Sequence, residues 1–137
     1  MDKFIWSDEW SLGNETIDDQ HKILLNILND IEKGDILLEN LLIRLVEYTT
    51  EHFGDEEQLM YKNNYPENFL NPHKREHKKF KEALLELTFA TIKALEQESN
   101  TKLKKLKGNL TKFCFIWFEQ HFLGTDKTFV NYLNENA

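Results

Sequence analysis

Apolar residues recur at spacings of three and four along four long segments of this 137-residue chain. This spacing predicts amphipathic helices, because residues three and four apart share one helix face. The segments run from Asp18 to Gly34, from Asn40 to Lys62, from Asn71 or Pro72 to a polar break at 97–100, and from about Leu103 to Gly124. We expect Asp18 or Asp19 to cap the first helix, Pro72 to lie in the first turn of the third, and Gly124 to end the fourth.

The short breaks between these segments favour an all-α fold, an antiparallel up-down-up-down four-helix bundle. Residues 1–17 lack a sustained helical period and are expected to form an ordered arm packed on the bundle. Residues 127–133 are expected to form one short C-terminal helix. We therefore interpret residues 1–137 as a single domain.

Composition excludes several classes of protein. With 40% hydrophobic and 30% charged residues, the chain is typical of a globular protein rather than a disordered one. The net charge of −7 and the absence of an extended basic surface argue against nucleic acid as a partner. No apolar run approaches the roughly 18 residues of a membrane span, and no signal peptide is visible, so a cytoplasmic location is expected. A single Cys excludes an internal disulfide framework.

All five histidines fall on the inward stripes of the predicted helices. One such imidazole is more often packed in a core than bound to a metal, but five unpaired buried imidazoles would cost several kcal/mol each. In the predicted topology, the start of the first and third helices and the end of the second and fourth share one end of the bundle. The fold therefore gathers the histidines in one layer: His21, His52, His73, His77 and His121.

Two carboxylates belong to the same layer. Glu56 follows His52 by four residues, as His77 follows His73, so each pair lies on one helix face one turn apart. Asp126 follows His121 by five residues, which is about 140° on an ideal α-helix. Both side chains can point inward only if the chain leaves α-helical geometry, which Gly124 would allow. The alternative is that Asp126 caps the short C-terminal helix.

The size and chemistry of this ligand set indicate two metal ions. Five imidazoles and two carboxylates exceed the about four ligands of a zinc site, and mixed N/O ligation suits iron, manganese, zinc or copper. If both carboxylates bridge and an oxide or hydroxide is shared, about eleven of about twelve positions of two six-coordinate ions are filled. One vacancy on one ion admits a single small diatomic molecule. Nitrogen-rich ligation favours reversible binding over O–O bond cleavage.

These residues resemble the hemerythrin family, in particular its single-domain bacterial branch. The resemblance covers nearly the whole chain and rests on four segments: Ile17-Asp18-Asp19-Gln20-His21, His52-Phe53-x-x-Glu56-Glu57-x-x-Met60, His73-x-x-x-His77 and Trp117-x-x-x-His121-x-x-x-x-Asp126. It implies a non-haem di-iron centre with an oxo or hydroxo bridge. One iron would be bound by His73, His77 and His121, the other by His21 and His52, and Glu56 and Asp126 would bridge both.

The resemblance also implies that dioxygen binds at the iron held by two histidines, in a dry apolar pocket. Candidate lining residues are Trp117, Phe53, Leu24 and Leu25, for which plain core packing is an equally open interpretation. The expected function is reversible dioxygen binding for transport, storage or delivery, without enzymatic activity, with an oxygen-using enzyme as a possible recipient. The alternatives are an oxygen or redox sensor acting through a partner, a nitric oxide- or peroxide-handling protein, and a bundle with purely structural metal.

Overall fold

The computed structural model describes residues 4–136, and within them the chain is helical without a strand. A 3-10 turn, Asp8–Trp10, lies in the N-terminal arm. The helices that follow are α1 (Glu15–Lys33), α2 (Leu38–Lys62), α3 (Glu67–Glu96), α4 (Asn100–Trp117) and α5 (Lys127–Glu135), and a π-helical segment, Phe118–Asp126, joins α4 to α5. The predicted all-α class is confirmed.

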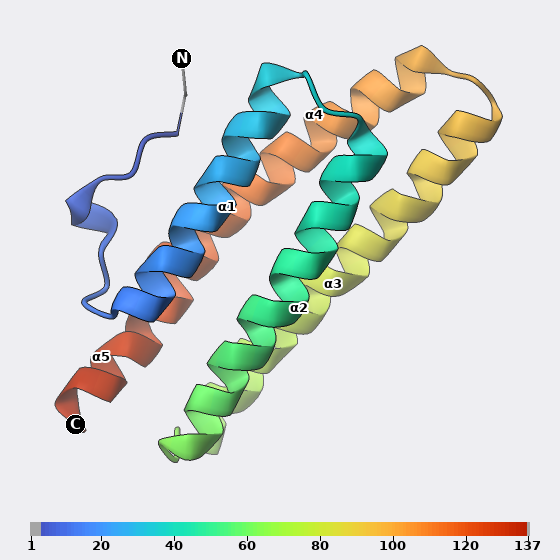
Figure 1. Ribbon diagram of the computed structural model, residues 1–137. Coiled ribbons are helices and arrows are strands. Elements are labelled where there is room, and N and C mark those ends of the chain that lie inside the picture. The colour runs from blue at the N-terminus through green and yellow to red at the C-terminus, as the bar shows by residue number, and fades with distance from the viewer. Residues whose placement is uncertain (1–3, 137) are drawn as a thin grey trace.

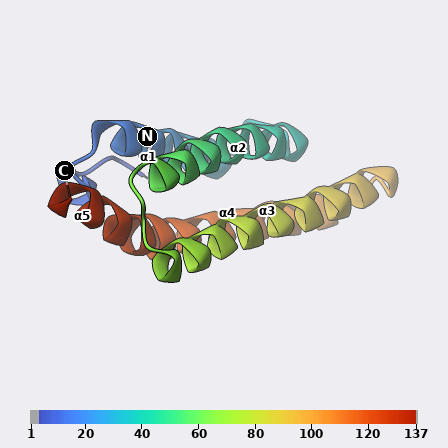
Figure 2. The ribbon, with the colours of Figure 1, turned by 90° about the horizontal axis from the view of Figure 1, so that it is seen from below.

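The helices form two layers, with α1 and α2 in one and α3 and α4 in the other (Figure 2). Successive helices run in opposite directions (Figure 1). The start of α1, the end of α2, the start of α3 and the end of α4 therefore lie at one end of the bundle, where α5 continues the line of α4. The predicted topology, with its short C-terminal helix, is confirmed. The predicted N-terminal arm is observed from residue 4 to the start of α1 at Glu15, and its residues 1–3 lie outside the described residues.

The start of α1 differs from the prediction. Asn14 is the N-cap, and its side chain accepts a hydrogen bond from the Ile17 amide at 3.1 Å. Neither Asp18 nor Asp19 has this role, because both lie inside the helix. Asp18 instead accepts hydrogen bonds from the Ser11 hydroxyl at 2.5 Å and the Leu12 amide at 2.9 Å. Its buried carboxylate thus fixes the N-terminal arm to α1.

Helix α3 begins earlier than the predicted Asn71 or Pro72. Pro66 is its N-cap, and Pro72 lies inside the helix, beyond the first turn. A proline at this position removes one backbone hydrogen bond. The added first turn brings Leu70, which is 6% exposed, into an apolar cluster, and this burial offsets the lost bond.

The prediction that Gly124 ends the fourth helix is wrong. The chain continues through a π-helical segment from Phe118 to Asp126 and passes directly into α5. The residues with a left-handed backbone among the described glycines are Gly13 and Gly34, so Gly124 does not break the helix. The chain leaves α-helical geometry by widening its turns instead of stopping.

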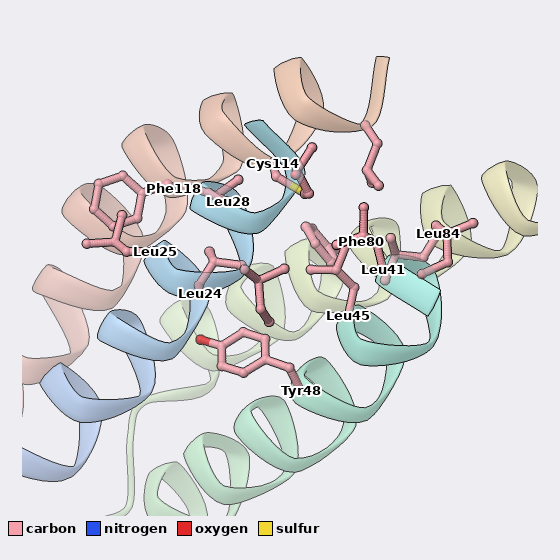
Figure 3. Packing of buried hydrophobic residues seen from close by; sticks show 14 of the residues in the cluster. Leu24, Leu25, Leu28, Leu41, Leu45, Tyr48, Phe80, Leu84, Cys114 and Phe118 are labelled. Atoms are coloured by element: carbon pink, nitrogen blue, oxygen red, sulfur yellow. The ribbon is translucent and has the colours of Figure 1, made fainter. Parts of the chain in front are cut away.

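The apolar core consists of two clusters. The large cluster fills the bundle with side chains from α1 to α4 and from the π-helical segment, and ten of its members are labelled in Figure 3. The small cluster is separated from the large one by the histidines. Its members are Ile17, Met60, Tyr65, Leu70, Phe129 and Val130. Near the end of α3, Ala94 is buried, whereas Leu95 is 41% exposed. Among the described residues, no helix has the length and apolarity of a membrane span.

Candidate metal centre

Seven side chains that combine imidazole and carboxylate groups meet between the two apolar clusters. None of them is more than 2% exposed. They come from α1, α2, α3 and the π-helical segment: His21, His52, Glu56, His73, His77, His121 and Asp126. The structure thus brings all seven sequence-predicted ligand candidates into one buried layer.

Three imidazoles gather on one side of this layer, and we call them the three-imidazole group. The Nε2 atom of His73 lies 2.6 Å from Glu56 Oε1 and 2.9 Å from Asp126 Oδ1. The Nε2 atom of His121 lies 3.1 Å from the same Asp126 oxygen. The Nε2 atom of His77 lies 3.6 Å from Glu56 Oε1 and 3.2 Å from His121 Nε2. Ligand atoms of all five residues are close enough to one another to surround one ion.

The remaining two imidazoles form the two-imidazole group on the other side. The Nε2 atom of His21 lies 3.0 Å from Asp126 Oδ2. The Nε2 atom of His52 lies 3.3 Å from Glu56 Oε2 and 4.0 Å from Asp126 Oδ2. His21, His52 and Asp126 form a second set of possible metal ligands.

The two carboxylates connect these groups in the same way. Glu56 directs Oε1 to the three-imidazole group and Oε2 to His52. Asp126 directs Oδ1 to His73 and His121, and Oδ2 to His21 and His52. Each carboxylate therefore offers one oxygen to each of two positions, which is the arrangement of a bridging ligand.

The π-helical segment explains why Asp126 reaches the centre. In an α-helix, a residue five positions after His121 would point well away from it. The wider π-helix places residues five apart next to each other, and π-helical turns are frequently found at functional sites. His121 and Asp126 are both buried as a result. Asp126 is the N-cap position of α5 but makes no side-chain capping bond, so the alternative role predicted for it is wrong.

Several polar atoms of the layer lack a hydrogen-bond partner among the described residues. They are His21 Nδ1, His52 Nε2, both Glu56 oxygens, both His73 nitrogens and Asp126 Oδ1. Buried polar atoms without partners are costly, and a native fold retains them where an ion or water supplies the interaction. The unpaired Nε2 atoms face carboxylate oxygens, so a cation between them would satisfy both. The residues present therefore fit a metal centre.

The imidazoles differ in the direction of their pKa shifts. Burial lowers the pKa of His52 to about 3 and that of His77 to about 4. Burial also acts to lower the pKa of His73 and His121, but the carboxylates of Asp126 and Glu56 outweigh it and raise these values to about 9 and about 10. Burial without a metal thus imposes conflicting protonation states on one layer, whereas metal binding requires every imidazole to be neutral.

A set of outer residues orients three of the imidazoles through their Nδ1 atoms. Gln20 Oε1 lies within hydrogen-bond distance of His52. Glu57 Oε2 is 3.3 Å from His77, and Glu76 Oε1 is 3.2 Å from His121. Such partners fix the ring orientation of metal-binding histidines.

The sequence predicted no role for these three outer residues. Gln20, Glu57 and Glu76 each directly precede or follow a ligand candidate in the chain, yet each pairs with an imidazole on a different helix or segment. Only the packing between helices reveals the pairing.

Aromatic rings enclose both imidazole groups. Trp117 stacks on His121 with ring centres 4.1 Å apart, and Phe53 stacks on His77 at 4.0 Å. Two rings that sequence reasoning did not propose as lining lie against the two-imidazole group. Phe122 stacks on His21 at 3.9 Å, and Tyr48 stacks on His52 at 5.5 Å.

The predicted lining leucines, Leu24 and Leu25, are buried in the large apolar cluster together with Tyr48, Phe53 and Phe122. Their role as pocket lining therefore stays a prediction.

The fold and this layer define a helical bundle with a buried metal-binding centre at one end. A family model for the hemerythrin HHE cation binding domain matches residues 12–133. Similar proteins include the bacteriohemerythrins of Stenotrophomonas maltophilia and Clostridium acetobutylicum, each 27% identical to this chain. The first match covers 96% of this chain and 82% of the relative, and the second covers 93% and 99%. The myohemerythrin of Theromyzon tessulatum is 30% identical over 88% of this chain and 86% of its own length.

The chain belongs to the hemerythrin family, because the family model spans most of its length. The predicted resemblance is confirmed. The helical bundle, the buried His/Glu/Asp cluster and the family together fit an iron-binding, oxygen-binding hemerythrin.

Proposed function

We propose that this protein binds dioxygen reversibly at a pair of iron ions and serves in oxygen transport, storage or delivery rather than in catalysis. The observation that best supports the proposal is the division of the two carboxylates. Glu56 and Asp126 each offer one oxygen to the three-imidazole group and the other to the two-imidazole group. A single-metal site would not need ligands arranged around two positions.

The ligand sets differ by one imidazole, and this difference supports binding of a single diatomic molecule. We assign His73, His77 and His121 to one iron, and His21 and His52 to the other, with both carboxylates and an oxide or hydroxide shared. When bound, the iron pair supplies the electrons that reversible dioxygen binding requires. The open position then lies beside His21 and His52, where Phe122 and Tyr48 stack on the imidazoles and exclude water.

The decisive test is optical and uses the purified, iron-loaded protein. Anaerobic reduction followed by mixing with air should produce a visible absorption band that disappears under vacuum and returns with air. Cys114→Ala is a matched control, because Cys114 is a buried member of the large apolar cluster and is not a proposed ligand. It should retain the band. If the reduced protein contains two irons but shows no reversible band, the proposal fails.

The proposal extends to the whole chain and its surroundings. The match of the family model to residues 12–133 supports one hemerythrin-like domain over residues 1–137. A cytoplasmic location and delivery of dioxygen to an oxygen-using enzyme are parts of the same proposal, and both require experiments in the native cell.

A further inference from the structure

Cations are concentrated on one short stretch of α3. Five of the 17 Lys and Arg residues of the chain lie within the eight positions 74–81, where Glu76 is the one acid. The rest of the chain is acidic, since the net charge of the whole is −7. This basic stretch overlaps His77 and therefore lies over the candidate metal centre.

A surface cavity of about 380 Å³ opens in this basic stretch. Its cationic lining consists of Lys74, Arg75, Lys78 and Lys81, and the other lining residues are Glu57, Asn71 and His77. His77 is 1% exposed, yet its ring forms part of the cavity wall. A molecule seated here would be separated from the candidate metal centre by a single imidazole.

Contacts around the cavity fix two of the cations in place. The Lys74 ammonium donates a hydrogen bond to the Tyr61 hydroxyl and lies 5.1 Å from the centre of that ring. The Lys81 ammonium lies 5.8 Å from the ring centre of Phe53, whose ring stacks on His77. Cation–π contacts of this kind hold a charge without neutralising it.

The acid in the cavity lining does not cancel this positive charge at the surface. The Glu57 carboxylate is directed to the Nδ1 atom of His77, at 3.3 Å, and its side chain is 21% exposed. Arg75 and Lys78 are exposed. The surface presented to an incoming molecule is therefore positive, although the protein as a whole is negative.

We propose that this cavity is the docking site of an acidic electron-transfer protein that reduces the oxidised metal centre through His77. The inference rests on the proposed function, because reversible dioxygen binding requires ferrous iron and oxidised protein must be reduced again. The transfer forms and breaks no bond. The donor loses one electron for each iron(III) that becomes iron(II). The positive surface attracts an acidic donor to this face, and the negative charge of the rest of the protein repels the donor from the other faces.

The first test measures anion binding and does not depend on iron. Isothermal titration of the purified protein with hexacyanocobaltate(III), a redox-inert trianion, compares the wild type with Arg75→Gln/Lys78→Gln. The matched control is Lys104→Gln/Lys105→Gln, which removes the same charge from exposed positions of α4 roughly 25 Å along the helix from His121. We expect the affinity to fall about tenfold in the cavity variant and to change less than about twofold in the control. Equal changes in both variants would overturn the proposal.

The second test measures electron transfer to the iron(III) protein by stopped flow. The anionic reductant iron(II)-EDTA and the cationic reductant hexaammineruthenium(II) are compared in the same three proteins. In the cavity variant, the rate of reduction by the anionic reductant should be about tenfold lower than in the wild type, and the rate of reduction by the cationic reductant should be unchanged or higher. Added salt should decrease this difference between the two proteins. An unchanged ratio of the two rates would refute docking at this cavity. Absence of the reversible oxygen band in the wild-type protein would instead refute the proposed function, and the titration would still decide whether the cavity binds anions.

Discussion

The two halves of the candidate metal centre share their carboxylates but differ in almost everything else. The three-imidazole group has carboxylates as outer partners for two of its rings, Glu57 and Glu76. In the two-imidazole group, His52 pairs with the neutral amide of Gln20, and the Nδ1 atom of His21 has no hydrogen-bond partner among the described residues. The first half has more ligands, and more negative charge lies behind them.

The difference suits one half of the layer to tight metal binding and the other half to binding of a gas molecule. Outer carboxylates increase the basicity of the imidazoles they contact and so strengthen metal binding. We therefore expect the three-imidazole group to hold its ion tightly with a filled coordination sphere. The two-imidazole group should hold its ion less tightly and leave one position for a gas molecule.

Removal of a shared carboxylate should abolish the difference between the two imidazole groups, because both groups should lose their iron. Glu56→Ala removes oxygens offered to both groups and leaves buried imidazoles without their counter-charge. We expect the iron content to fall from two per chain to nearly none, with a marked drop in melting temperature, measured by elemental analysis and calorimetry. Glu51→Ala, an exposed acid on the same helix, is the control. Retention of two irons by Glu56→Ala would show that the ligand assignment is wrong.

Removal of one imidazole should separate the halves. His52→Ala should leave about one iron per chain, since the three-imidazole group keeps its own ligands. It should also abolish dioxygen binding. His77→Ala should disturb the more strongly held ion and therefore cost more iron and more thermal stability. Elemental analysis and oxygen titration of both variants measure the contrast. Equal iron loss in the two variants would contradict the difference in strength between the halves.

Acid and alkali should destabilise the metal-free protein through different imidazoles. In the folded protein, the pKa values of His52 and His77 are lowered from the ordinary imidazole value of 6.5 to about 3 and about 4. Below pH 6.5, these two residues therefore bind more protons in the unfolded chain than in the folded protein. The free energy of unfolding should therefore fall as the pH decreases from 6.5 toward 4.

His73 and His121 should make the free energy of unfolding depend on pH in the opposite direction. Their pKa values are raised to about 9 and about 10, so their stabilisation is present below 6.5 and is lost as the pH rises through 9 to 10. Urea titrations of the metal-free protein over this pH range should show both declines. His52→Gln should flatten the acid decline and spare the alkaline one, and a change in both limbs would contradict the separate origins.

The smallest effect is expected at an outer residue. Gln20→Ala removes the hydrogen-bond partner of His52 Nδ1 and leaves the other imidazoles untouched. The affinity for the second iron should fall about tenfold, while the first remains bound. Titration of the metal-free protein with ferrous iron under anaerobic conditions measures both steps. A loss confined to the first step would reverse the proposed assignment of the two halves.

The sequence predicted the bundle well because its helices have clear apolar periods and its topology follows from short connections. The same reasoning placed five histidines in one layer, and the structure brings them together with Glu56 and Asp126. The prediction about Gly124 was wrong because a glycine signals a stop equally well whether the chain ends a helix or only changes its winding. The five-residue spacing of His121 and Asp126 indicated that the chain must leave α-helical geometry for both to point inward, but it did not indicate that π-helical turns achieve this.

Helix starts were also harder to predict than helix faces. A proline favours the first turn, so Pro72 suggested a later start than the true one at Glu67. The extra turn is stabilised by the burial of Leu70 in the small apolar cluster, whose α5 members Phe129 and Val130 lie far away in the sequence. Outer partners such as Glu76 escaped prediction for the same reason, since their contacts cross between helices.

Crystallography of the iron-loaded protein, with anomalous data collected at the iron absorption edge, will show whether the buried layer holds two iron ions. We predict two anomalous peaks per chain, one among His73, His77 and His121 and one beside His21 and His52, with Glu56 and Asp126 between them. A single peak, or electron density with any of these five imidazoles turned toward solvent, would contradict the account.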